Sequence, residues 1–210
     1  MTVQASSQTI ARAHVYSFLA KAFGYPSQQV VHELEGALPS ISLGMSEIDQ
    51  NAALLQAVNK LQQAFERYEW QQLQREYSQL FTGREQCKLN EVDYEKASAT
   101  MPQRLADISA FYLAFGLQVA PGTGERLDFI GTEADFLHAL LLKRYHAEQQ
   151  GLAEQADICA KAESQFLKEH VLWWMPRLAQ RLIEHKGFYG ALGALLLAFL
   201  QEEQAHCGDG

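Results

Sequence analysis

The chain has 210 residues, of which 48% are hydrophobic and 20% charged, and its formal net charge is −8 with histidine neutral. This length and composition predict a folded protein with a substantial core and exclude a mainly disordered chain. The negative charge argues against nucleic acid as the main partner and is compatible with a cationic partner.

The N-terminal stretch and the cysteines further restrict the class of protein to which the chain can belong. Residues 1–14 lack the long apolar core of a secretory signal peptide. The best membrane candidate is the apolar run 188–200, which is shorter than the about 20 residues that cross a bilayer and is predicted to be a buried helix. The three cysteines are odd in number and share no close spacing, so neither a disulfide framework nor a zinc site is indicated. We therefore expect a cytoplasmic protein.

Apolar residues recur at helical spacing along most of the chain, and no alternating run indicates a strand. Gly24 and Pro26 are expected to end a first helix, Ser27 to cap a second one, and Pro39 to end it before a loop at 40–44. The sequence predicts an all-α fold of about eight or nine helices. The expected helices are 9–23, 27–38, 47–68, 70–81, 103–115, 125–149, 152–170, 172–185 and 188–204.

The least periodic stretch, 84–100, is polar and charged and is expected to be a long ordered loop or hinge. It divides one overall domain into an N-terminal helical half, 1–83, and a C-terminal helical half, 101–210. A flexible connection is expected at 116–124. Its Gly-Thr-Gly run precedes a helix but lacks the lysine and the strand of a phosphate-binding loop. No cofactor is therefore expected, and only weak nucleotide binding stays open.

The segment 125–149 combines an unusually wide apolar surface with three carboxylates in eight residues, Asp128, Glu133 and Asp135. On a helix, Asp128, Thr132 and Asp135 would lie within about 40° of one another. Carboxylates are rarely buried without partners. We therefore expect an acidic strip that borders a peptide-binding groove. A satisfied internal network in a non-catalytic helical adaptor is an alternative.

Two short patterns are compatible with a metal site. Asp135-x-x-His138 and Glu203-x-x-His206 each place a carboxylate and an imidazole one helical turn apart, as in four-helix di-metal carboxylate proteins. Such a site needs two further inward glutamates, for which the sequence has no motif. A helical di-metal protein is therefore an alternative, and we expect no metal, no catalytic residue and no enzyme activity. The other histidines, among them His170, are expected at the surface or at helix caps.

Four motifs resemble, in order, those of the TorD/DmsD/NarJ family of molybdoenzyme-specific chaperones. EYSQLFTG at 76–83 is similar to E-Y-x-x-L-F-x-G, and CKLNEVDY at 87–94 keeps the Cys, Glu and Tyr of C-P-P-Y-E-x-x-Y. LDFIGTEADFL at 127–137 is similar to P-D-H-x-x-x-E-x-x-F-M, with Phe129 where the family has His. FLKEHVLWW at 166–174 resembles F-L-x-x-H-L-x-x-W. The resemblance extends over most of the chain.

This resemblance implies an all-helical chaperone that is a monomer or a homodimer, in some members by exchange of halves about a hinge. It implies binding of the twin-arginine signal peptide, or the apo form, of a molybdopterin oxidoreductase of the dimethyl sulfoxide reductase family. The chaperone would assist cofactor insertion and prevent premature export. Reductases of trimethylamine oxide, dimethyl sulfoxide, nitrate and chlorate are all open as the client.

A twin-arginine signal presents two guanidinium groups followed by an apolar segment, so its receptor should place carboxylates beside an apolar groove. Asp128, Glu133 and Asp135 would supply the acidic side. Phe136 is expected in the core. The other candidate peptide-binding residues are Tyr77, Leu80, Phe81, Glu91, Tyr94, Phe129 and Trp174.

Overall fold

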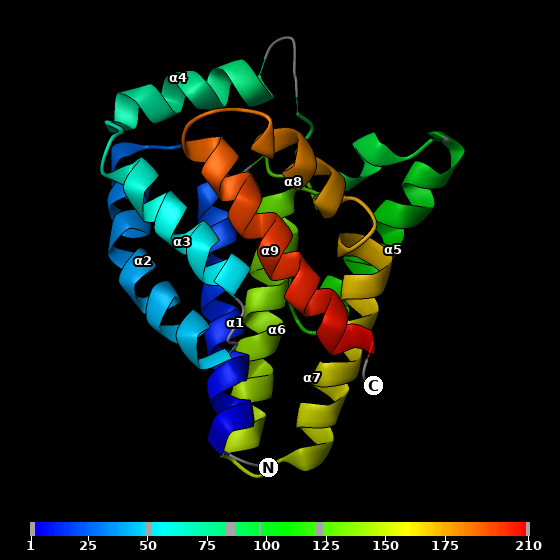
Figure 1. Cartoon of the computed structure of the whole chain (residues 1–210). Helices are drawn as coiled ribbons and strands as arrows, with labels where there is room; N and C mark the ends of the chain where they lie inside the picture. The colour runs from blue at the N-terminus through cyan, green and yellow to red at the C-terminus, as the bar shows by residue number, and fades with distance from the viewer. Residues whose placement is uncertain (1–2, 49–51, 83–86, 97, 121–123, 209–210) are drawn as a thin grey trace.

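The structure is a computed structural model that describes residues 3–48, 52–82, 87–96, 98–120 and 124–208. Over these residues the chain forms nine α-helices and no β-strand, which confirms the all-α prediction (Figure 1). The helices are α1 (Val3–Ala22), α2 (Gln28–Ile48), α3 (Ala52–Phe65), α4 (Trp70–Phe81), α5 (Met101–Ala114), α6 (Ile130–Gln149), α7 (Ala153–Phe166), α8 (Met175–Ile183) and α9 (Phe188–Gly208).

Helices α1 and α6 lie side by side at the centre of the molecule and make its most extensive contact between two elements (Figure 1). Helix α2 covers α1, and α7 covers α6. The last helix, α9, packs on α8 and on α3. Because α3 belongs to the first half of the sequence and α9 to the second, one hydrophobic cluster draws its side chains from both halves.

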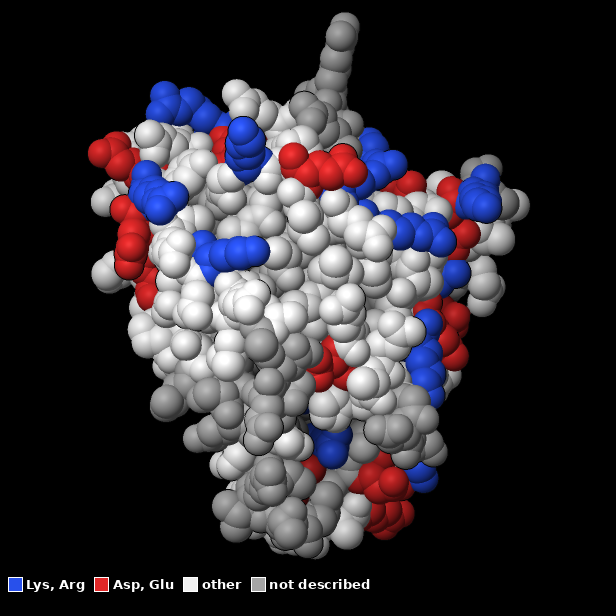
Figure 2. All heavy atoms as spheres, viewed as in Figure 1, with Lys and Arg blue, Asp and Glu red and all other residues white. Residues whose placement is uncertain are grey.

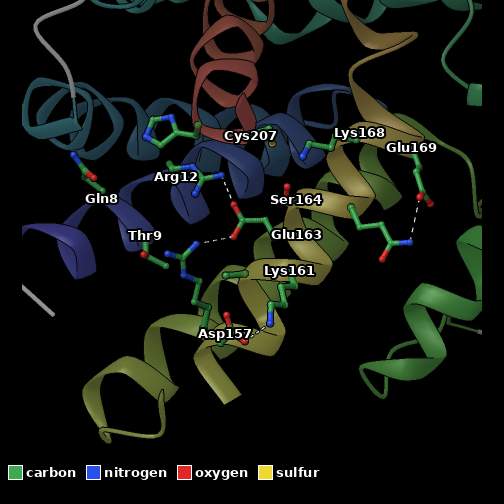
Figure 3. A pocket seen from close by; sticks show the side chains of 14 residues that line it. Gln8, Thr9, Arg12, Asp157, Lys161, Glu163, Ser164, Lys168, Glu169 and Cys207 are labelled. Atoms are coloured by element: carbon green, nitrogen blue, oxygen red, sulfur yellow. Dashed lines mark hydrogen bonds and ion pairs between the residues drawn. The ribbon is translucent and has the colours of Figure 1, made fainter. Parts of the chain in front are cut away.

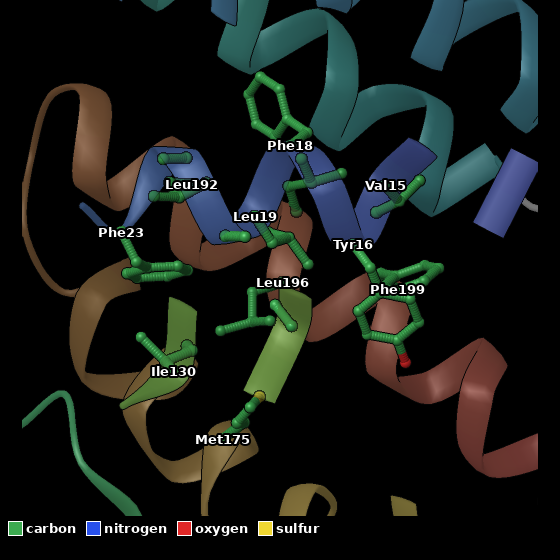
Figure 4. Close-up of a cluster of buried hydrophobic side chains, with 14 of the residues drawn as sticks. Val15, Tyr16, Phe18, Leu19, Phe23, Ile130, Met175, Leu192, Leu196 and Phe199 are labelled. Carbon is green, nitrogen blue, oxygen red and sulfur yellow. The ribbon is translucent and has the colours of Figure 1, made fainter. Parts of the chain in front are cut away.

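Four helices meet in the part of the core that Figure 4 shows. Apolar residues recur every third or fourth position of α1, so successive turns present them to the same interior. Each labelled side chain is at most 2% exposed. They are Val15, Tyr16, Phe18, Leu19 and Phe23 from α1 and the residue after it, Ile130 from α6, Met175 from α8, and Leu192, Leu196 and Phe199 from α9.

The apolar run 188–200 is the start of α9 and is buried in the core, as predicted. Its most deeply buried members, Phe188, Tyr189, Leu192 and Leu195, are each at most 1% exposed. Within the described residues, no helix combines the length and the apolar character that a membrane span needs.

Two predictions about local structure in the first half are confirmed. The Oγ of Ser27 accepts the N–H of Val30 at 3.2 Å and so caps α2. Helix α4 covers 70–81, as predicted. The expected closing role of Gly83 and the residues that join α2 to α3 lie outside the described residues.

The prediction that Pro39 ends the second helix, with a loop at 40–44, is wrong, because α2 continues through both. A proline inside a helix costs about 3 kcal/mol or more, since it removes a hydrogen bond and clashes with the preceding turn. Leu38 before the proline is 4% exposed and Ile41 after it is 2% exposed. Continuing the helix keeps both side chains in the core, and this burial offsets the cost of Pro39.

The expected start of the central helix at 125 is also wrong, because α6 begins at Ile130. The backbone before it pairs with the segment 87–95. The N–H of Glu91 donates to the carbonyl of Asp128 at 2.8 Å, and the N–H of Ile130 donates to the carbonyl of Leu89 at 2.9 Å. Backbone groups used in this pairing cannot form a first helical turn. Asp128 therefore lies before the helix and not on its surface.

The stretch expected to be a long loop, 84–100, has local order where it is described. A 3-10 turn forms at Glu91–Tyr94 and another at Ser98–Thr100, which leads into α5. In the second half, the helix expected over 152–170 is α7 followed by a π-helical turn at Leu167–Val171. The Gly-Thr-Gly run considered for nucleotide binding falls largely outside the described residues.

Gly187 joins α8 to α9 with φ of 101°, a conformation that other residues rarely adopt. A Cβ at this position would lie 2.3 Å from Tyr68 Oη and 2.8 Å from Glu76 Oε1. We expect Gly187→Ala to lower the free energy of unfolding, measured by urea denaturation, by about 1–3 kcal/mol. The matched control is Gly36→Ala in α2, where a Cβ meets nothing within 4 Å and where stability should rise by up to about 1 kcal/mol. Equal effects of the two substitutions would contradict this account.

Candidate functional site

Three of the four sequence motifs meet in one polar cluster inside the protein. It lies where the segment 87–95, the start of α6 and the π-helical turn come together. Its three carboxylates, Glu91, Asp128 and Glu133, are each 0% exposed, and so is His170. We call this group the carboxylate cluster. Its members are Glu91, Asp128, Glu133, Arg104, Arg126, His170 and Trp173.

Asp128 is fully partnered within the protein. Its two oxygens accept a bidentate pair of hydrogen bonds from Arg126, each 2.9 Å long. The oxygen Oδ2 also accepts the backbone N–H of Val92 at 3.1 Å. Bidentate Arg–carboxylate pairs are among the stronger hydrogen-bonded contacts in proteins. Asp128 therefore fixes the 87–95 segment against the start of α6.

Glu91 binds the same segment to two other parts of the chain. Its Oε1 accepts the indole N–H of Trp173 at 2.6 Å and a guanidinium N–H of Arg104 at 3.0 Å. Its Oε2 lies 3.2 Å from Nδ1 of His170. The guanidinium of Arg104 also stacks on the Trp173 ring, 4.7 Å from its centroid. One buried carboxylate thus connects the segment with α5 and with the π-helical turn.

Glu133 lies beside these paired groups, yet both of its carboxylate oxygens are buried without a hydrogen-bond partner. Burial raises its pKa well above the ordinary value, and the neighbouring carboxylates Glu91 and Asp128 raise it further. Burial and these neighbouring charges therefore favour the neutral, protonated form of the side chain. Nε2 of His170 is likewise buried without a partner.

The expectation of an open acidic strip is wrong for two of its three members, because Asp128 and Glu133 are 0% exposed and Asp135 alone is exposed. Asp128 is enclosed by its hydrogen-bond partners, and the Glu133 side chain is buried in the protein interior. Of the other candidate peptide-binding residues, Leu80, Phe81, Glu91 and Trp174 are buried, and Tyr77, Tyr94 and Phe129 are partly buried. Contact of these residues with a peptide stays a prediction.

The aromatic residues among these candidates pack against one another. The Tyr77 and Phe81 rings are 5.0 Å apart, and the Tyr94 ring lies 5.2 Å from that of Trp174. The Trp174 indole N–H donates to the carbonyl of His170 at 2.6 Å. Phe136 is 3% exposed, as predicted for a core residue. These contacts are internal packing, and contact of the same rings with a peptide stays a prediction.

The first motif lies apart from the carboxylate cluster and connects α4 to the start of α9. Oε1 of Glu76 accepts the N–H of Tyr189 at 3.3 Å, where a helix N-terminus favours a negative group. Burial raises the pKa of Glu76, and backbone hydrogen bonds from Tyr189 and Phe188 oppose the shift. The carbonyl of Leu80 accepts the N–H of Cys87, so α4 also positions the second motif.

Sequence reasoning missed the partners of the carboxylates. Arg104, Arg126 and Trp173 were not among the candidates, and the expected surface or cap position of His170 is wrong because that side chain is 0% exposed. Arg126 could have been suspected, since it precedes Asp128 by two residues. No spacing indicates Arg104, which comes from another helix and meets Glu91 only in the folded chain.

The face of the molecule seen in Figure 2 has most of its charged side chains around its edge, whereas the area over the middle of α9 is largely uncharged. Acidic and basic residues are interspersed along that edge. On this face the net negative charge is therefore not concentrated in one groove.

A hollow of about 720 Å³ lies between α1, α7 and the end of α9, and Figure 3 shows its lining. Glu163 accepts hydrogen bonds from Arg12 and, at 3.1 Å, from Arg144. Glu203 accepts hydrogen bonds from Arg12 and, at 2.7 Å, from the Tyr16 hydroxyl. These charges satisfy one another. None of the buried unpartnered atoms among the described residues lines this hollow.

Among the described residues, one group of side chains could hold a metal ion. Asp107, Glu169 and His170 each place a ligand atom within 4.8 Å of the others. Neither of the carboxylate–histidine turns considered from the sequence takes part in this group. Glu203 is instead paired with Arg12, and Nδ1 of His206 lies 2.8 Å from a carbonyl oxygen of its own helix. The geometry thus gives no support to a di-metal centre at those turns.

A family model described as the nitrate reductase delta subunit matches residues 49–180, which is more than half of the chain. The chain belongs to this family. The TorD/NarJ family resemblance of the four motifs is thereby confirmed.

Several members of the TorD/NarJ family are similar in sequence. The chaperone protein TorD of Vibrio cholerae serotype O1 is 32% identical over 98 residues, which cover 46% of this chain and 43% of TorD. The perchlorate reductase assembly chaperone protein of Dechloromonas aromatica is 27% identical over 191 residues, covering 83% and 79%. The selenate reductase assembly chaperone protein of Thauera selenatis is 27% identical over 105 residues, covering 50% and 53%. The chain thus spans less than half the length of the TorD relatives it matches.

The fold is shared with a solved structure. A crystal structure from Archaeoglobus fulgidus, described as that of a putative redox enzyme maturation protein, superposes with a TM-score of 0.61. The superposition covers 90% of this chain and 93% of the other, at 17% sequence identity. At this identity the likeness establishes the fold.

Because the pKa of Glu133 is raised in the folded chain, stability should depend on pH in a defined direction. Between the ordinary pKa near 4.5 and the raised one, the folded chain keeps a proton that the unfolded chain has lost, so the free energy of unfolding falls as pH rises. We expect the free energy of unfolding of Glu133→Gln to rise relative to that of the wild type as pH increases above the ordinary carboxyl pKa, by up to about 1.4 kcal/mol per pH unit.

Urea denaturation at several pH values measures this effect. Glu35→Gln, an exposed position on α2, is the matched control and should follow the wild-type pH dependence. If Glu133→Gln and the wild type show the same slope against pH, Glu133 is not the group that holds the proton.

Proposed function

We propose that the protein is an assembly chaperone that binds the precursor of a molybdopterin oxidoreductase through its twin-arginine signal peptide. In this role it assists cofactor insertion in the cytoplasm and prevents premature export. The client belongs to the dimethyl sulfoxide reductase family of enzymes, and the protein acts by binding and not by catalysis.

The observation that carries this proposal is the alignment with the perchlorate reductase assembly chaperone over 83% of the chain, together with membership of the TorD/NarJ family. Two physical features support it. The net charge of −8 favours a cationic partner. Several large apolar side chains are exposed at the surface, as a protein that binds an apolar segment requires, including Leu142, Leu152 and Ile158.

Calorimetric titration of the protein with a synthetic twin-arginine signal peptide tests the proposal. We expect saturable binding that weakens as salt is raised toward about 1 M, because guanidinium–carboxylate attraction is screened. A peptide in which glutamine replaces both arginines is the control and should bind more weakly with little dependence on salt. Absence of binding by the intact peptide at low salt would overturn the proposal.

The role of Asp128 can be separated from peptide binding. Since Asp128 is buried and its partners Arg126 and Val92 belong to the same chain, Asp128→Asn should lower the free energy of unfolding by about 1–3 kcal/mol. The folded variant should bind the signal peptide within about twofold of the wild type, a difference of less than 0.5 kcal/mol. Urea denaturation and calorimetry provide the two readouts. A large loss of affinity at unchanged stability would instead support the peptide-contact role that the sequence suggested.

A further inference from the structure

Helix α6 has one face that the core does not cover. Thr132, Asp135, Ala139, Leu142 and His146 follow one another at intervals of three or four residues and so lie along one side of the helix. None of these five is buried, whereas Leu137 and Leu141 on the opposite side are 0% exposed. The uncovered face runs between the residues that follow α5 and the start of α7.

Two hollows adjoin along this face. The first, of about 200 Å³, is lined by Leu117, Val119, Glu125, Asp135 and Ala139 among others. The second, of about 520 Å³, is lined by Phe115, Leu142, Leu152 and Ile158 among others. Ala139 of the first is one helical turn from Leu142 of the second, and Phe115 is two residues from Leu117. From Asp135 to His146 the combined groove is about 16 Å long at 1.5 Å per residue.

The two ends of this groove differ in charge. Glu125 and Asp135 both line the first hollow. Burial is the main cause that raises the pKa of Asp135, the neighbouring His138 lowers it, and the charge of Glu125 raises it, so the two carboxylates repel each other. A cation between them would relieve that repulsion. Lys21, which also acts on Asp135, is itself paired with Glu33 at 2.7 Å. Lys143 lies at the far end, where it would repel a second cation.

Between these ends the groove is apolar. Leu142 is 37% exposed, Leu152 44% and Ile158 52%, and all three line the same hollow. Adjoining exposed apolar side chains in a soluble fold mark a surface that a partner covers. A helical segment of about eleven residues would match the length of the groove.

We propose that the α6 groove binds the signal peptide of the client precursor, with its arginines at Glu125 and Asp135 and its apolar segment along Leu142, Leu152 and Ile158. This inference rests on the proposed function and gives it a location different from the buried carboxylate cluster. The order of charges fixes the direction, since basic residues at the Lys143 end would meet a like charge.

Calorimetry on the full chain tests the location. The probe is a synthetic peptide with two adjacent arginines followed by an apolar run of leucine and alanine, compared with the same peptide carrying glutamines for arginines. Asp135→Asn should weaken binding of the arginine peptide roughly three- to tenfold and leave the glutamine peptide unchanged. Leu152→Ser combined with Ile158→Ser should weaken both peptides by roughly tenfold or more.

Matched controls lie outside the groove. Asp107→Asn and Leu113→Ser change exposed side chains on α5, and each should bind within about twofold of the wild type. Far-UV circular dichroism and thermal unfolding identify any variant that fails to fold, in which case Leu142→Asn replaces the double substitution.

The outcomes separate the two proposals. If the wild type binds the arginine peptide and the groove variants bind it equally well, the location is wrong and the proposed function stands. If the wild type does not bind the peptide, both are overturned. If light scattering shows a dimer that the Leu152→Ser/Ile158→Ser variant converts to a monomer with unchanged peptide affinity, the groove is an interface between two copies and the inference fails.

Discussion

The contact on which the site depends is the one between Asp128 and the segment 87–95. A buried carboxylate accepts two hydrogen bonds from Arg126 and one from the backbone of Val92, while the backbone of Asp128 accepts the N–H of Glu91. With the segment fixed in this way, Glu91 reaches Trp173, Arg104 and the His170 ring. Three of the four family motifs, although far apart in sequence, are therefore adjacent in space and build one structural junction.

The contacts in this junction change how the role of the acidic residues is interpreted. Carboxylates in an apolar helix suggest a binding site for the cation of a partner. The cation that pairs with Asp128 is instead Arg126 of the same chain, and the cation that pairs with Glu91 is Arg104. Asp135 differs from them because it is exposed on the side of α6 that the core leaves uncovered. An exposed carboxylate beside apolar side chains is therefore found at Asp135, in the α6 groove, and not in the carboxylate cluster.

The helical class and most helix positions follow from apolar spacing alone, and α4 was predicted residue by residue. The errors arise where distant residues decide the local structure. Pro39 signals a helix end, yet burial of Ile41 continues α2. Helical spacing extends back to 125, yet backbone pairing with Leu89 and Glu91 delays α6 until Ile130. Burial of Glu133 could not be foreseen either, since periodicity assigns a face to a residue but not the elements that cover it.

The position of α9 has a consequence for how the chain is made. This helix is the last of the sequence, yet it packs on α3, and its Glu203 pairs with Arg12 near the beginning of the chain. The first half therefore lacks one of its covering surfaces until α9 has been made and has docked. A copy without α9 would leave the apolar side of α3 uncovered and Arg12 without its contact to Glu203.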